Sequence, residues 1–113
     1  MKLAGPCKIL KIYVSEDSRY EGHNLYHALV LKLKEMGIAG VTVTRGIEGF
    51  GKKRRLHRAQ VVDLSASLPV VIEVIDTKEH IERILPTVNE MVNDGLILIQ
   101  DAAVLKYKSI EEK

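Results

Sequence analysis

The chain has 113 residues, of which 46% are hydrophobic and 28% charged, and its formal net charge is +2. These values predict one folded domain spanning residues 1–113 and exclude collagen-like, low-complexity and wholly disordered chains. No apolar run approaches the ~18 residues of a membrane helix, the N-terminal residues lack a signal-peptide core, and a single cysteine excludes an internal disulfide. We therefore expect a soluble, cytoplasmic protein that does not contact membranes directly.

The first half of the chain predicts a strand, a helix and a second strand. Residues 7–14 are rich in β-branched and aromatic types, which indicates a strand. Apolar residues recur at helical spacing between His23 and Met36, and Gly37 ends that helix. Residues 41–45 alternate in the manner of a strand.

The second half again predicts a strand, a helix and a strand. Residues 70–75 form a strand, and the helix after it begins at an Asp76 cap with Glu79 three residues later. Pro86 lies within the helical stripe and is expected to kink the helix or restart it. Residues 96–100 open the last strand, which is expected to run with an interruption toward Tyr107.

The order of elements is therefore βαββαβ, which predicts the ferredoxin-like α+β fold. In this fold a four-stranded antiparallel sheet carries both helices on one face. The strands at 70–75 and 96–100 are apolar on both sides, although two helices cover only one face. We expect the second face to pack in a cyclic homo-oligomer.

The connection between the second and third strands, at about 46–68, is long and contains the chemistry-bearing residues. Residues 52–58 hold five positive charges, so the rest of the chain has a formal charge of −3. Gly49 and Gly51 flank Phe50, and a glycine-rich turn followed by Lys52, Lys53, Arg54 and Arg55 favours phosphate binding through backbone N–H groups and basic side chains. Residues 46–53 also match the P-loop formula except at Lys53, where a hydroxyl residue is required.

Several motifs together resemble the PII signalling proteins. Residues 40–44 followed by Gly-Phe-Gly-Lys at 49–52 look like the strand and loop base of that family, and the runs at 54–59, 63–65 and 68–74 are similar to its branch known as domain of unknown function 190. The resemblance covers about residues 8–107. It implies a homotrimer with sheets facing the three-fold axis and an adenine nucleotide (ATP, ADP or AMP) at subunit interfaces. Gly49, Phe50, Gly51 and Lys52 would contact its phosphates.

The chain departs from the PII pattern at the second phosphate loop. PII proteins have a second glycine-rich loop after the second helix, but here that place holds only residues 93–95, and the long loop contains no tyrosine for nucleotidylation. The side chains available to donate hydrogen bonds to phosphate in place of that loop are Arg45, Arg54, Arg55 and His57. Lys106 and Lys108 could reach the site from a neighbouring subunit.

The sequence thus predicts a regulatory protein, not an enzyme, that binds an adenine nucleotide and signals to an unidentified target protein through a flexible basic loop. Ligand phosphate would order residues 49–65.

One alternative is a module whose basic loop binds an acidic partner or nucleic acid without a small ligand, although five aromatic residues offer little base stacking. Another is a metal-binding protein using His23 and His27, spaced four apart on the first predicted helix. No nucleophile motif is present, and Cys7 is expected to be a buried apolar residue.

Overall fold

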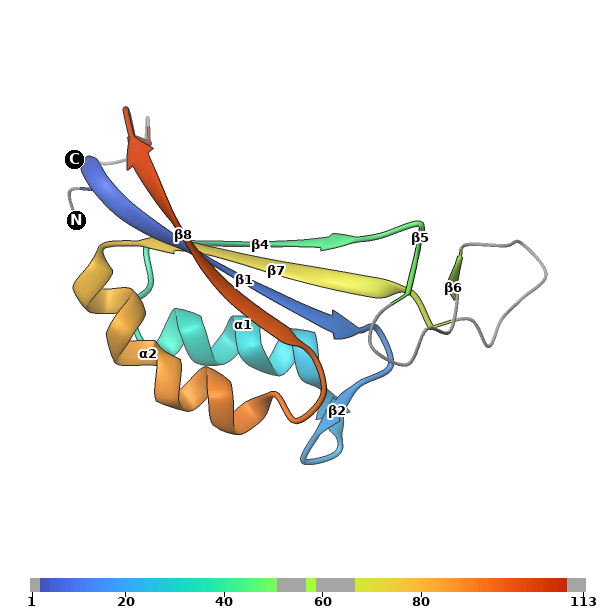
Figure 1. Ribbon diagram of the computed structural model, residues 1–113. Helices are drawn as coiled ribbons and strands as arrows, with labels where there is room; N and C mark the ends of the chain where they lie inside the picture. Colours follow the sequence, from blue (N-terminus) through green and yellow to red (C-terminus); the bar gives the residue numbers. More distant parts are fainter. Residues whose placement is uncertain (1–2, 51–56, 59–66, 110–113) are drawn as a thin grey trace.

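In the computed structural model, which describes residues 3–50, 57–58 and 67–109, a four-stranded antiparallel sheet carries two helices on one face (Figure 1). Across the sheet the strands are β4 (Gly40–Arg45), β7 (Pro69–Asp76), β1 (Gly5–Ser15) and β8 (Leu96–Val104). The helices are α1 (Leu25–Glu35) and α2 (Lys78–Met91). The predicted ferredoxin-like α+β fold is confirmed.

Two short ladders lie outside this sheet and were not expected from the sequence. β2 (Arg19–Tyr20) pairs with β3 (His23–Asn24) between β1 and α1, and β5 (Glu48–Gly49) pairs with β6 (His57–Arg58) within the connection from β4 to β7. Strands of two residues are too short to show a repeating apolar pattern, so periodicity alone does not reveal them.

The core forms where the central strands meet the helices. Alternate residues of β1 and β7 are buried, and the register places Leu10 opposite Val74 and Ile12 opposite Ile72. Both helices contribute one buried stripe, at Leu25, Leu29 and Leu33 from α1 and at Ile81, Ile84, Val88 and Met91 from α2. Each such side chain contributes about 1.5–3 kcal/mol when fully buried.

The start and middle of α2 and the last strand differ from the sequence prediction. The N-cap is Thr77, whose Oγ1 accepts a hydrogen bond from the His80 N–H at 3.3 Å, so the prediction of Asp76 was wrong by one residue. The helix is continuous through Pro86, so of the two predicted effects, a kink or a restart, the restart does not occur. Pro86 is exposed, so water can satisfy the carbonyl that loses its helical partner. β8 runs from Leu96 to Val104 without the predicted interruption.

The face of the sheet opposite the helices retains much apolar surface. Its positions include five half-buried apolar side chains on the three strands β1, β7 and β8, namely Ile9, Tyr13, Val71, Ile75 and Leu98. Leu96 on the same face is 54% exposed. Within the described ranges, neither helix has the length and apolarity needed to cross a membrane.

The sheet has two ends that we name by the segments found there (Figure 1). The loop end comprises the C-terminal ends of β1 and β4 and the N-terminal ends of β7 and β8, and the connection 46–68 starts and finishes there. The tail end is the opposite one, where β8 finishes and residues 105–109 follow.

Candidate functional site

The connection 46–68 is tied together where it leaves and re-enters the sheet. We call this region the loop base and define it as residues 15–17, 45–46 and 67–69. The Gly46 N–H donates to the carbonyl of Pro69 at 2.7 Å, and the Glu16 N–H donates to the carbonyl of Leu68 at 2.8 Å. The turn after β1 therefore holds the returning limb of the loop, which in turn holds the outgoing limb.

Side chains of the same turn reinforce these backbone contacts. The buried Ser67 hydroxyl donates to Asp17 Oδ1 at 2.8 Å and also hydrogen-bonds to the Ser15 hydroxyl. Because the Asp17 carboxylate accepts the Ser67 proton, the Ser15 hydroxyl is the donor in the second bond. Ser67, at the start of the returning limb, is thus held by two groups of the β1 turn.

Arg45, a predicted phosphate donor, has an acidic partner at the loop base. Its guanidinium forms an ion pair with the carboxylate of Glu16, and the two side chains are 60% and 27% exposed. Since β7 lies between β4 and β1, the Arg45 side chain spans the start of β7 to reach Glu16. Glu16 was not predicted as the partner of Arg45, because the two residues lie 29 positions apart in sequence.

Gly46 has a steric role at the point where the loop leaves β4. A Cβ placed there would lie 2.8 Å from Pro69 Cγ, closer than side-chain carbons normally approach. Glycine at this position lets the two limbs pass at hydrogen-bonding distance. Gly49, by contrast, lies in β5 and does not adopt a positive φ.

The structure describes four of the predicted phosphate-binding residues. Arg45 ends β4, Gly49 lies directly opposite His57 in the β5–β6 ladder, and Phe50 is 59% exposed. The ladder therefore brings the two limbs of the loop together a few residues beyond Arg45. The other predicted residues lie outside the described residues: Gly51, Lys52, Lys53, Arg54 and Arg55.

The lysines suggested as donors from a neighbour lie far from the loop base of their own chain. Lys106 and Lys108 are exposed and follow β8 at the tail end, whereas Arg45 and Gly49 belong to the loop end. Within one chain the full length of the sheet separates the two groups. Any contribution of these lysines to a site at the loop base requires a second subunit.

The histidine pair does not have the geometry assumed for a metal site. α1 begins at Leu25, so His23 belongs to the β2–β3 ladder and only His27 lies on the helix. The prediction that both imidazoles share one helix face was wrong, because the chain forms a short hairpin before the helix starts. Among the described residues, no group of three or more His, Cys, Asp or Glu is arranged to hold a metal ion.

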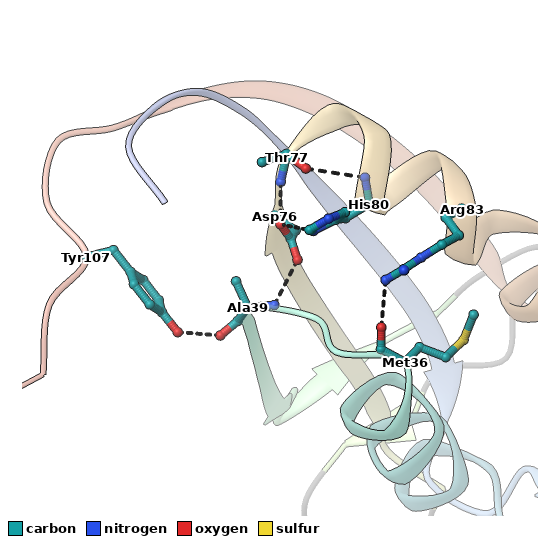
Figure 2. A network of polar contacts seen from close by, with 7 residues as sticks. All are labelled: Met36, Ala39, Asp76, Thr77, His80, Arg83 and Tyr107. Atoms are coloured by element: carbon teal, nitrogen blue, oxygen red, sulfur yellow. Dashed lines mark hydrogen bonds and ion pairs between the residues drawn. The ribbon is translucent and has the colours of Figure 1, made fainter. Parts of the chain in front are cut away.

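A second polar cluster lies at the tail end around the fully buried Asp76 (Figure 2). Its Oδ2 accepts the Ala39 N–H at 2.8 Å, and its Oδ1 accepts the Thr77 N–H at 2.6 Å and lies 2.9 Å from His80 Nδ1. The Tyr107 hydroxyl donates to the carbonyl of Ala39. One carboxylate thus connects the entry to β4, the start of α2 and, through Ala39, the segment after β8.

The buried polar side chains described at the tail end are hydrogen-bonded, and its cysteine is buried. In the described part of the chain, no buried side-chain nitrogen or oxygen lacks a hydrogen-bond partner, so the Asp76 cluster is internally satisfied. Cys7 is buried as predicted, at 5% exposure. Burial raises the pKa of its thiol, the charge of Asp76 raises it further, and a raised pKa lowers the thiolate fraction needed for nucleophilic attack.

Comparison with known sequences identifies the family. The DUF190 family model, described as "Uncharacterized ACR", matches residues 7–104. A UPF0166 protein of Methanocaldococcus jannaschii is 43% identical over 105 residues, covering 92% of this chain and 96% of the relative. A UPF0166 protein of Aquifex aeolicus is 41% identical over 98 residues, covering 87% and 92% respectively.

Comparison with solved structures agrees with this assignment at the level of the fold. A protein described as PII-like and signaling, from Thermus thermophilus, superposes with a TM-score of 0.65 at 19% identity, covering 92% of this chain and 94% of that chain. CPII from Thiomonas intermedia K12, bound to ADP and bicarbonate, gives 0.63 at 20% identity, with 89% and 90% covered. The same protein bound to ADP, AMP and bicarbonate gives 0.66 at 15% identity, with 89% and 90% covered. The chain therefore belongs to the DUF190 (UPF0166) family and has the fold of PII-like signalling proteins.

Proposed function

We propose that this protein is a cytoplasmic PII-like regulator that binds an adenine nucleotide at the loop base, between subunits of a homotrimer. In this proposal the phosphates contact Gly49, Phe50, Gly51 and Lys52, together with basic side chains among Arg45, Lys53, Arg54, Arg55 and His57. Binding changes the state of the basic loop and so its affinity for a target protein. Such a response requires that the nucleotide bind the two loop states with different affinities.

The observation that carries the proposal is the meeting of the two loop limbs beside Arg45. Gly49 and His57, eight positions apart in sequence, lie opposite each other in the β5–β6 ladder. Arg45 ends β4 three residues before β5 begins. Backbone groups from both limbs therefore meet a few residues beyond Arg45, and phosphate recognition uses backbone N–H groups together with basic side chains.

The ligands of a structural neighbour support an adenine nucleotide as the candidate. CPII, which has the same fold at 15–20% identity, was solved with ADP and with ADP and AMP, in both cases with bicarbonate. The identity is too low to transfer individual contacts. It does make ADP, AMP and bicarbonate the first ligands to test.

The open face of the sheet supports the trimer. Its apolar side chains are half-buried in the isolated chain, and a symmetric contact between sheets would remove them from water. A trimer would also allow Lys106 and Lys108 of one subunit to approach the loop base of the next. This matters because only residues 92–95 connect α2 with β8, in place of the second glycine-rich phosphate loop of PII proteins.

A thermal-shift panel tests the proposal directly. The purified protein is melted with ATP, ADP, AMP and cyclic AMP, each with and without Mg²⁺ and bicarbonate. A ligand present at 100 times its dissociation constant stabilises the folded state by about 2.7 kcal/mol, which moves the melting temperature by several degrees. Lys52→Ala should abolish the shift, whereas Lys34→Ala, an exposed lysine on α1, should preserve it.

Two outcomes would contradict the proposal. If no nucleotide shifts the melting temperature, nucleotide binding is contradicted. If the shift survives Lys52→Ala, the assignment of the site to the basic loop is contradicted. Light scattering at micromolar concentration tests the trimer separately, because a monomer there would leave the open face without its partner.

A second function is favoured by the concentration of charge in the loop. Residues 52–58 hold five positive charges in a chain that is otherwise mildly acidic, which suits an acidic protein or nucleic acid. Binding of that kind weakens steeply with salt. Salt-sensitive binding of an acidic polymer, without any nucleotide shift, would favour this function over the first.

A further inference from the structure

We infer that the Glu16 carboxylate is an internal competitor for the nucleotide phosphates at Arg45, so that ligand binding exchanges one anion for another. The inference rests on the proposed function and adds to it how occupation of the site changes the loop base. The contacts that carry it, between Glu16 and Arg45 and around them, lie within the described ranges. It makes Glu16 a residue that sets the affinity of the site without touching the ligand.

The first step is that Arg45 already has an anionic partner. Its guanidinium is paired with Glu16, so a phosphate that uses Arg45 must displace or share that carboxylate. The Arg45 side chain is 60% exposed, so a ligand can approach it from water. A phosphate accepts two parallel hydrogen bonds from a guanidinium and carries more charge than one carboxylate, and both properties favour the exchange.

The second step is that the exchange removes one of the contacts that hold the outgoing limb, which keeps its Gly46 N–H bond to the Pro69 carbonyl, and leaves the returning limb in place. The returning limb is held by the backbone N–H of Glu16 on Leu68 and by Asp17 on Ser67, and neither contact uses the Glu16 side chain. The outgoing limb is tied to the β1 turn by the Arg45–Glu16 ion pair. Breaking that ion pair therefore acts on the segment that leads from β4 into the ladder at Glu48–Gly49.

The third step concerns the direction of the effect on affinity. In the free protein Arg45 is stabilised by Glu16, and this stabilisation is lost when the ligand takes Arg45. The ligand thus binds more weakly than it would without Glu16, by the strength of the ion pair. Exposed ion pairs have strengths that correspond to factors of about 1.4–5 in an equilibrium constant, so the expected effect on affinity lies in the same range.

Calorimetric titration with ADP, and with pyrophosphate as a probe that lacks base and sugar, tests the inference. Glu16→Gln keeps the size of the side chain and the backbone N–H bond to Leu68 but removes the charge, and it should lower the dissociation constant of both ligands by a factor of about 1.4–5. Glu16→Ala, which also removes the hydrogen-bond acceptor, should tighten them at least as much. The matched control is Glu82→Gln, which makes the same charge change on the exposed surface of α2 and should leave affinity unchanged.

A double-mutant cycle separates competition from a general charge effect. In an Arg45→Met background, Glu16→Gln should have no effect on affinity, because the group for which ligand and carboxylate compete is gone. Unchanged affinity in Glu16→Gln, or an equal gain in the Arg45→Met background, would overturn the inference and leave the proposed function intact. If no variant binds ADP or pyrophosphate, the proposed function is wrong and the inference is wrong with it.

Discussion

Each end of the sheet has a carboxylate that connects separate segments, but the two carboxylates differ in how deeply they are buried. At the tail end the Asp76 carboxylate joins three segments and is fully buried (Figure 2). At the loop end the Glu16 carboxylate joins β1 to β4 through Arg45, and the Arg45 side chain is 60% exposed. A fully buried carboxylate cannot exchange its partners for water, whereas the Glu16 side chain is 27% exposed and its partner Arg45 can be solvated when the pair separates. Burial therefore decides which of the two junctions is fixed and which can change.

The energetic difference between the ends follows from solvation. Removing one partner of a buried hydrogen bond leaves a polar group without water and costs about 1–3 kcal/mol per group. Separating an exposed ion pair costs only about 0.2–1 kcal/mol, because water solvates both charges. The tail end can therefore hold the fold, while the ion pair at the loop end can separate at little cost.

The largest effect is expected from Asp76→Ala. The change leaves the N–H groups of Ala39 and Thr77 without their acceptor and removes the partner of His80. We expect the free energy of unfolding to fall by about 2–4 kcal/mol, measured by urea denaturation.

A smaller loss in the free energy of unfolding is expected from Gly95→Ala. This change tests whether the backbone at the loop end is as rigid as the backbone at the tail end. A Cβ at Gly95 would lie 2.5 Å from the carbonyl oxygen of Tyr13 and 3.1–3.2 Å from the side chains of Val92 and Val14. Because the nearest atom is backbone, β8 must shift away from β1, at a cost of about 1–3 kcal/mol. The same urea titration measures it. No loss would show that this edge strand can move freely.

Glu16→Ala is the change at the loop end that matches Asp76→Ala. It removes one carboxylate from an exposed ion pair and should lower the free energy of unfolding by less than about 1 kcal/mol in the same titration. Equal losses in Asp76→Ala and Glu16→Ala would contradict the comparison between the two ends.

The fold was largely predictable because its signals are local and repeated. The apolar stripe of α2 and the alternation in β7 extend over enough residues to define element type, and their order restricts the topology. The errors concern element boundaries, such as the start of α2, where the identity and position of a single residue determine the outcome. Thr77 and Asp76 are both good N-cap types, and only the buried position of the Asp76 carboxylate at the end of β7 makes Thr77 the cap.

The candidate site was predictable in its residue types but not in its partners. Arg45 was identified as a cation near the loop, but its partner Glu16 is 29 positions away in sequence. The pair forms because the sheet order places β7 between β4 and β1 and aligns their ends. The same register decides that Ser67 reaches Asp17. No local pattern contains this information, since it depends on how three strands are aligned.

The smallest expected loss of stability concerns the ion pair between Lys8 and Asp101, which is at the tail end but exposed. It therefore shows whether exposure or position in the sheet determines the cost of losing a carboxylate's partner. A hydrogen bond from Lys8, and then its charge, hold the pKa of Asp101 below its ordinary value of 3.8, although the Asp101 side chain is 84% exposed. A carboxylate with a lowered pKa in the folded state stabilises the fold above the ordinary value, and this contribution is lost as the pH falls through the folded-state pKa.

If exposure and not location decides, the Lys8–Asp101 pair should behave like Arg45–Glu16 and unlike Asp76. NMR titration of the Asp101 carboxyl carbon should give a midpoint that rises toward 3.8 in Lys8→Met, with the other carboxylates of that region as internal references. The loss of stability at neutral pH should be far smaller than in Asp76→Ala, since water replaces Lys8 at an exposed carboxylate but cannot replace the donors around a buried one. A loss as large as that of Asp76→Ala would mean that the tail end is sensitive as a whole, and burial of the single carboxylate would no longer explain the contrast between the two ends.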